Sequence, residues 1–203
     1  MGRPGLARLL GVRREGPEPP ETRAGQPLHP LTVPNLVGFT RIALIAAFLA
    51  IALPSDDGRV TIATTLFAAA AAFAYLDGLL ARATGQYSRL GALLDPFVDR
   101  MLVLAGVVVA WKFELLPRWA LATLGARELA MIVLVAGALR LGLDIHVNWV
   151  GRIAVVPTMA AIAGALIADW WLPEILLYAG IAGALAASAL YVRDGVRALR
   201  ARG

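Results

Sequence analysis

Long apolar stretches separated by short polar ones run along most of the chain. Six of them are about as long as a helix that crosses the hydrocarbon core of a bilayer, roughly 20 residues. They are Leu36–Leu53, Val60–Leu76, Gly91–Trp111, Trp119–Leu139, Trp149–Ala168 and Leu172–Val192. The pattern therefore predicts an all-α, polytopic membrane protein with six transmembrane helices.

Composition agrees with a membrane protein and excludes several other classes. Of the 203 residues, 59% are hydrophobic and 16% are charged, whereas soluble domains are about 45–50% apolar. Cysteine is absent, so disulfides, zinc–thiolate sites and cysteine nucleophiles are excluded. The net charge of +5 is typical of arginines that set membrane topology and contact lipid headgroups. We expect membrane lipid, and no nucleic acid, as a partner.

Arginine placement predicts the orientation, because short cytoplasmic loops of membrane proteins are enriched in Lys and Arg. The arginines that fall on one side are Arg3, Arg8, Arg13, Arg14, Arg23, Arg82, Arg89, Arg140, Arg152, Arg193, Arg197, Arg200 and Arg202. The opposite loops hold Arg59, Lys112 and Arg118 beside several acids. We therefore predict a multi-pass protein of the cytoplasmic membrane with both termini in the cytoplasm.

Three segments follow from this topology. Residues 1–30 are basic and rich in Pro and Gly, and we expect a cytoplasmic N-terminal segment there. Within it, Leu6–Val12 forms either a short basic amphipathic turn on the membrane or no regular structure. Residues 31–192 form the six-helix membrane domain, and residues 193–203 form a basic cytoplasmic tail.

Three acids lie where the second and third apolar stretches meet, on the predicted cytoplasmic side. They are Asp77, Asp95 and Asp99. A charge at mid-bilayer costs roughly 2.5–3.5 kcal/mol, so acids kept there need a compensating partner. Asp95 and Asp99 lie about one helical turn apart, and Asp77 is expected to end the preceding helix, before a short polar connection. Converging carboxylates favour a hard divalent cation, Mg²⁺ or Mn²⁺.

The residues around these acids suit a large phosphorylated ligand. Gly78 and Gly91 lack side chains, so a bulky ligand could approach the backbone closely. Arg82 lies about one turn beyond Asp77 and could pair with a diphosphate. Carboxylates, a metal and a diphosphate-binding arginine in a membrane indicate transfer of a phosphoryl-type group on a lipid.

Other interpretations use the same residues. The three acids could neutralise Arg82, Arg100 and Arg127 and serve only to hold the helices together. A transporter is disfavoured because the chain shows no repeated halves, and an aspartyl protease because an arginine lies between its candidate acids. Arg41, about one turn inside the first stretch, either extends to the headgroups or points inward to meet a phosphate.

The stretch from Ala74 to Asp99 resembles the signature of the CDP-alcohol phosphotransferases, D-x2-D-G-x2-A-R-x8-G-x3-D-x3-D. Seven of the eight positions match, namely Asp77, Gly78, Ala81, Arg82, Gly91, Asp95 and Asp99. The eighth position, the first aspartate of the signature, is Ala74 here. The likeness extends over about residues 31–192 and is greatest to phosphatidylglycerophosphate and cardiolipin synthases. Its further marks are Asn35, Arg41, Arg127, Glu128 and the stretch Trp149–Arg152.

The resemblance implies a homodimeric enzyme that transfers a phosphatidyl group from CDP-diacylglycerol to a polar alcohol, with glycerol 3-phosphate preferred, and releases CMP. In this family the signature aspartates surround two metal ions. By position, Asp77 and Asp95 would be metal ligands, and Asp99 would be the general base and a further ligand. The cytidine diphosphate would contact Gly78, Ala81, Arg82 and Gly91. The acceptor phosphate would meet Arg127, Arg140 and Arg152.

Ala74 leaves two outcomes open. An aspartate at this position would share a helix face with Asp77 and add a metal ligand that a methyl group cannot replace. Either the chain works with a single metal ion, or it is a degenerate family member that binds lipid or nucleotide without turnover.

Overall fold

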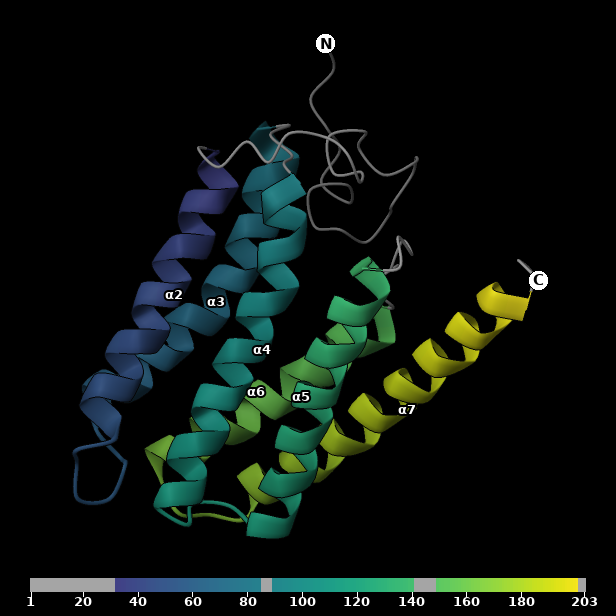
Figure 1. The fold of residues 1–203 in the computed structure, drawn as a ribbon. Helices are drawn as coiled ribbons and strands as arrows, with labels where there is room; N and C mark the ends of the chain where they lie inside the picture. Colours follow the sequence, from purple (N-terminus) through teal and green to yellow (C-terminus); the bar gives the residue numbers. More distant parts are fainter. Residues whose placement is uncertain (1–31, 85–88, 141–148, 201–203) are drawn as a thin grey trace. The chain divides into compact units, whose positions relative to one another are not determined.

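The structure, a computed structural model, describes residues 32–84, 89–140 and 149–200 (Figure 1). All regular structure in these residues is helical, which confirms the predicted all-α class. The helices are α2 (Val33–Ala52), α3 (Thr61–Thr84), α4 (Arg89–Lys112), α5 (Arg118–Arg140), α6 (Trp149–Ile167) and α7 (Leu172–Arg200). Each predicted apolar stretch falls on one of these helices. The predicted N-terminal segment, including Leu6–Val12, lies outside the described residues.

One predicted helix end is wrong. Helix α3 continues to Thr84, whereas a polar connection was expected directly after Gly78. Helix α7 continues to Arg200, into the segment expected as a basic tail. Hydropathy marks where apolar residues stop, but Leu, Ala and Arg are all strong helix formers and extend a helix into a polar environment. The first half of the signature therefore lies on a helix.

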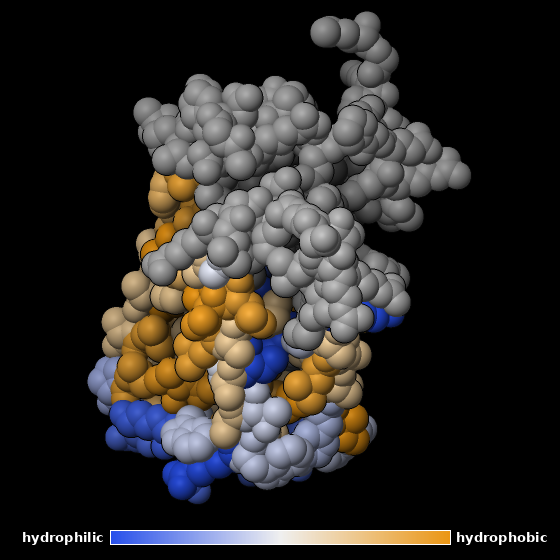
Figure 2. All heavy atoms as spheres, turned by 45° about the vertical axis from the view of Figure 1, so that its right-hand side comes forward, coloured by the Kyte–Doolittle hydropathy of each residue, from blue (hydrophilic) through white to orange (hydrophobic). Residues whose placement is uncertain are grey.

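Helices α2 and α7 each carry an apolar run long enough to cross a membrane, Asn35–Ala52 and Leu172–Leu190. Helices α3 and α6 hold shorter apolar runs, Thr61–Ala74 and Val155–Ile167. Large apolar side chains are exposed on the described helices, and Figure 2 shows broad apolar surface over them. Such surface is expected of helices that contact lipid, and the six membrane crossings stay a prediction.

The described helices belong to two compact units. The first unit contains α2 up to Phe48 together with Thr65–Leu102, which covers most of α3 and the first part of α4. In its core the rings of Phe48 and Phe67 lie 5.2 Å apart at 56°, and both side chains are fully buried. A Cβ added to Gly38 would lie 2.8 Å from Leu94 Cδ2. Helix α2 therefore packs against both α3 and α4.

The second unit contains Leu49–Thr64 and the chain from Val103 onward. Helices α6 and α7 pack closely where Gly180 meets Thr158, because a Cβ on Gly180 would lie 3.0 Å from the Thr158 backbone nitrogen. The loop between α2 and α3 turns at Gly58, whose φ is +75° and which lies against the Phe113 ring. The Arg59 Nε donates to the Ala165 carbonyl at 3.2 Å, tying the same loop to α6.

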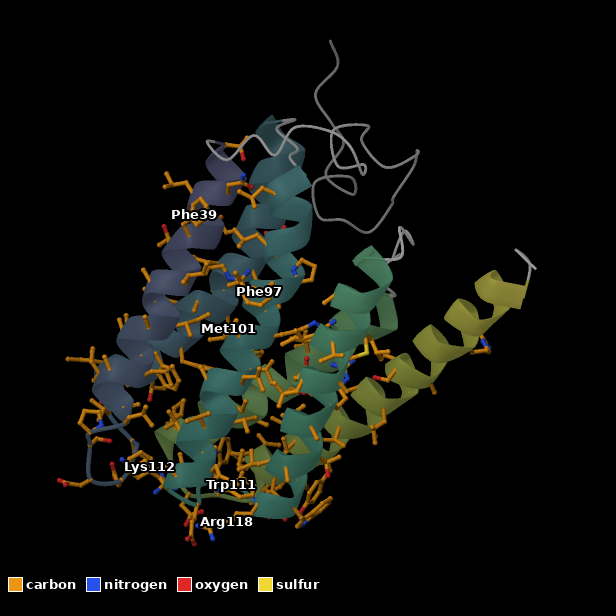
Figure 3. All side chains as sticks on the ribbon, in the orientation of Figure 1. Phe39, Phe97, Met101, Trp111, Lys112 and Arg118 are labelled. Carbon is orange, nitrogen blue, oxygen red and sulfur yellow. The ribbon has the colours of Figure 1, made fainter. Side chains whose placement is uncertain are left out.

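Aromatic and cationic side chains gather in the second unit where α4 ends and α5 begins. Trp111, Lys112 and Arg118 lie there (Figure 3), and the Arg118 guanidinium is 5.7 Å from the centre of the Trp111 ring. The neighbouring Trp119 stacks on Tyr178 of α7 with ring centres 5.3 Å apart. Exposed tryptophans beside cations are typical of the membrane–water interface.

Candidate functional site

The signature residues lie on two consecutive helices. Helix α3 carries Ala74, Asp77, Gly78, Ala81 and Arg82, and helix α4 carries Gly91, Asp95 and Asp99. The side chains from position 77 to position 89 are outside the described part of the structure. The geometry of the site therefore rests on Ala74, Gly91, Asp95 and Asp99, all of which belong to the first unit.

Asp95 and Asp99 occupy consecutive turns of α4, as their spacing predicts. Both residues are partly exposed, and 40% of the Asp99 side chain is accessible. A ligand can therefore reach the Asp99 carboxylate from outside the protein.

Arg41 is the buried partner of Asp99. It is the one charged residue in the α2 sequence, and its side chain is only 1% exposed. Its Nη2 donates to Asp99 Oδ1 in an ion pair, and its Nε donates to the Ala70 carbonyl at 3.1 Å. Of the two predicted orientations, Arg41 therefore adopts the inward one.

Sequence reasoning missed the Arg41–Asp99 pair. The two residues are 58 positions apart, and no spacing rule connects them. A signal was nevertheless present, because a lone arginine in an apolar helix needs an anionic or carbonyl partner.

Ala74 lies beside this contact. It follows Ala70, whose carbonyl binds Arg41, by one turn of α3. The Ala74 methyl group offers no oxygen ligand in the place of the signature's first aspartate. Among the described side chains, no group of three acids or histidines is placed to hold a metal ion.

The available donors nevertheless suit one hard cation. Asp95 and Asp99 are oxygen donors one turn apart, and Asp77 is a third carboxylate in the signature. Mg²⁺ is commonly held by one or two carboxylates together with water and substrate phosphates. These three carboxylates are the residues that would hold such an ion.

Arg127, a predicted acceptor-binding residue, lies in the second unit and is already paired. Its Nη1 donates to Glu128 in an ion pair, and its Nε donates to Ser188 Oγ of α7 at 3.0 Å. The side chains of Arg127 and Glu128 are 11% and 5% exposed. The alternative interpretation paired Arg127 with a signature aspartate, whereas in the structure its ion pair is with Glu128. Arg140 and Arg152, the other two predicted residues, have side chains outside the described part.

Comparison with known proteins decides the family. The sequence profile of the CDP-alcohol phosphatidyltransferases matches residues 31–188. The chain belongs to this family. The match includes the complete Ala74–Asp99 stretch, so the resemblance seen in the sequence is confirmed.

Similar family members include the cardiolipin synthase (CMP-forming) of Streptomyces coelicolor. It is 35% identical over 176 residues, which cover 82% of this chain and 80% of the relative. The CDP-diacylglycerol–glycerol-3-phosphate 3-phosphatidyltransferase of Escherichia coli is 32% identical over 158 residues, covering 74% of this chain and 83% of the relative. Its Bacillus subtilis counterpart is 29% identical over 147 residues, covering 66% and 76%.

Membership places this CDP-alcohol phosphatidyltransferase among the transferases of phospholipid synthesis. The family is typically membrane-bound and generally uses a divalent metal. The identity of the ion, the homodimer and the cytoplasmic orientation stay predictions.

Proposed function

We propose that this CDP-alcohol phosphatidyltransferase transfers the phosphatidyl group of CDP-diacylglycerol to an alcohol, preferably glycerol 3-phosphate, and releases CMP. The observation that carries this proposal is the signature itself, with seven of its eight positions at the family spacing on α3 and α4. Two relatives named for the same donor and acceptor support the choice.

In the proposed step the acceptor hydroxyl oxygen bonds to the phosphatidyl phosphorus. The bond from that phosphorus to the bridging oxygen of the diphosphate breaks, and CMP leaves with the electron pair. Asp99 accepts the hydroxyl proton, a role supported by its accessible carboxylate.

The remaining signature residues would bind the donor. Asp77, Asp95 and Asp99 would hold Mg²⁺ or Mn²⁺, which when bound polarises the diphosphate and offsets its charge. The residues proposed to contact the cytidine diphosphate are Gly78, Ala81, Arg82 and Gly91.

For the acceptor phosphate, Arg140 and Arg152 are stronger candidates than Arg127. Glu128 already neutralises the Arg127 guanidinium, and both side chains are largely buried. A phosphate at Arg127 would therefore have to compete with an ion pair in a poorly solvated place.

We further propose a homodimer in the cytoplasmic membrane, with six spans and with the site and both termini facing the cytoplasm. The excess of arginines on that side of the chain supports the orientation.

Ala74 favours a second candidate function, binding of CDP-diacylglycerol or nucleotide without turnover. Loss of one signature carboxylate lowers the charge available to hold metal ions beside the diphosphate. The two candidates agree on the ligand and differ on the chemistry.

CMP release separates them. The purified chain in lipid vesicles would receive CDP-diacylglycerol, glycerol 3-phosphate and Mg²⁺ or Mn²⁺, beside the variants Ala74→Asp and Asp99→Asn. Activity in the natural chain that Asp99→Asn abolishes would support an enzyme with an incomplete carboxylate set. CMP release by Ala74→Asp alone would favour the binding function for the natural chain. No CMP release by the natural chain or by any variant would refute the proposed acceptor or donor.

A further inference from the structure

Arg41 and Asp99 differ sharply in exposure, although they form one ion pair. The Arg41 side chain is 1% exposed and the Asp99 side chain 40% exposed. The guanidinium therefore lies beneath the carboxylate, on the protein side, while the opposite side of the carboxylate remains accessible.

Arg41 also connects three helices of the first unit. It belongs to α2, donates to the Ala70 carbonyl of α3, and donates to Asp99 of α4. The Ala70 carbonyl lies in the turn of α3 that leads to Ala74, where the signature's first aspartate is missing. A permanent positive charge therefore lies beside the part of the site that has lost a negative one.

This placement has two consequences for a metal ion near Asp99. Arg41 donates to Oδ1 of the carboxylate, so Oδ2 keeps the larger share of the acceptor capacity for a ligand. The guanidinium charge also repels a divalent cation at short range, and partial burial limits the screening of that repulsion.

We propose that Arg41 is a positioning residue, which fixes Asp99 Oδ1 against α3 and presents Oδ2 to ligand, and whose charge weakens binding of a divalent cation beside Asp99. The proposal rests on the metal-dependent transfer proposed above. It makes one unusual prediction, that removing a buried residue of the site strengthens metal binding while it slows turnover.

Mn²⁺ binding tests the charge and needs no turnover. The full chain in detergent would be titrated with Mn²⁺, and free Mn²⁺ would be followed by electron paramagnetic resonance. Arg41→Gln, which removes the charge, is expected to tighten binding by about tenfold or more. Arg41→Lys keeps the charge and is expected to bind Mn²⁺ like the natural chain.

Turnover tests the positioning. In whichever background releases CMP, the natural chain or Ala74→Asp, both Arg41 variants are expected to lower kcat by about tenfold or more, because neither side chain reproduces both donated bonds. The KM for CDP-diacylglycerol should change little. Arg118→Gln is the matched control, since Arg118 is an exposed arginine paired with Glu114, and it should change neither measurement.

The outcomes that overturn the proposal are distinct. Unchanged or weaker Mn²⁺ binding in Arg41→Gln, with a cooperative thermal transition showing that the variant is folded, would leave Arg41 a structural residue. If Arg41→Gln does not fold, Mn²⁺ binding in Arg41→Lys decides: more than about threefold weaker binding there refutes the charge account. Absence of CMP release from every chain would refute the proposed function and leave the Mn²⁺ result standing.

Discussion

Gly180 is the position where a single methyl group should have the clearest effect on stability. In Gly180→Ala the new Cβ would lie 3.0 Å from the backbone nitrogen of Thr158 and 3.2 Å from its Cα, with the Thr158 Oγ1 closer still. The hydroxyl can rotate away, but the backbone of α6 cannot. Helices α6 and α7 must therefore move apart locally by several tenths of an ångström.

Two opposing terms set the expected size of the effect. Overpacking of this kind lowers the free energy of unfolding by about 1–3 kcal/mol. Replacing glycine by alanine in a helix raises it by about 1 kcal/mol. The matched control is Gly137→Ala in α5, where the added Cβ meets no atom within 4 Å. The control should gain about 0.5–1 kcal/mol, so the two variants should differ by about 2 kcal/mol.

Thermal unfolding in one detergent would measure this difference. For a chain of this size about 2 kcal/mol corresponds to roughly 4–8 °C in Tm, with Gly180→Ala the lower. A Tm for Gly180→Ala equal to or above that of Gly137→Ala would refute the close approach of α6 and α7. Adding Thr158→Ala tests which atoms matter, because it removes only the hydroxyl contact and should not restore the lost stability.

Two further predictions concern the core of each unit. Phe48→Ala should lower the free energy of unfolding by about 3–5 kcal/mol, because it deletes a fully buried ring that packs on Phe67, whereas Phe48→Leu should lower it by far less. Arg127→Met should destabilise by about 3–5 kcal/mol, because it removes the Arg127 cation from the largely buried Glu128 carboxylate. Adding Glu128→Gln should recover most of that loss, and chemical denaturation of the single and double variants would check both expectations.

The helices could be predicted from the sequence because each is built around an apolar run. The predicted and observed first residues of α6 and α7 are the same, Trp149 and Leu172, because apolar residues begin abruptly there. Where a helix continues into polar sequence, as α3 does beyond Gly78, hydropathy carries no information about its end. Helix propensity is the property that would have extended it.

The candidate site likewise has local features that the sequence predicts and non-local contacts that it does not. The i, i+4 spacing of Asp95 and Asp99 is local, so their common helix and their separation by one turn follow from sequence. The pairing of Arg41 with Asp99 is non-local and depends on how α2 packs beside α4, which Gly38 permits by its contact with Leu94. The Arg127–Glu128 pair joins adjacent residues, yet its burial beside Ser188 depends on the packing of α5 against α7.

The continuation of α3 through the signature changes which mutations the site can absorb. On a helix each residue advances the direction by about 100°, so positions 77, 78, 81 and 82 fall within an arc of about 140°. A one-residue insertion between Gly78 and Ala81 would rotate the later pair by about 100° relative to the earlier pair. In a loop the same insertion could be accommodated by a change in backbone conformation. For this chain, a substitution in the first half of the signature changes one side chain. An insertion or deletion there changes the orientation of the later signature residues relative to the earlier ones.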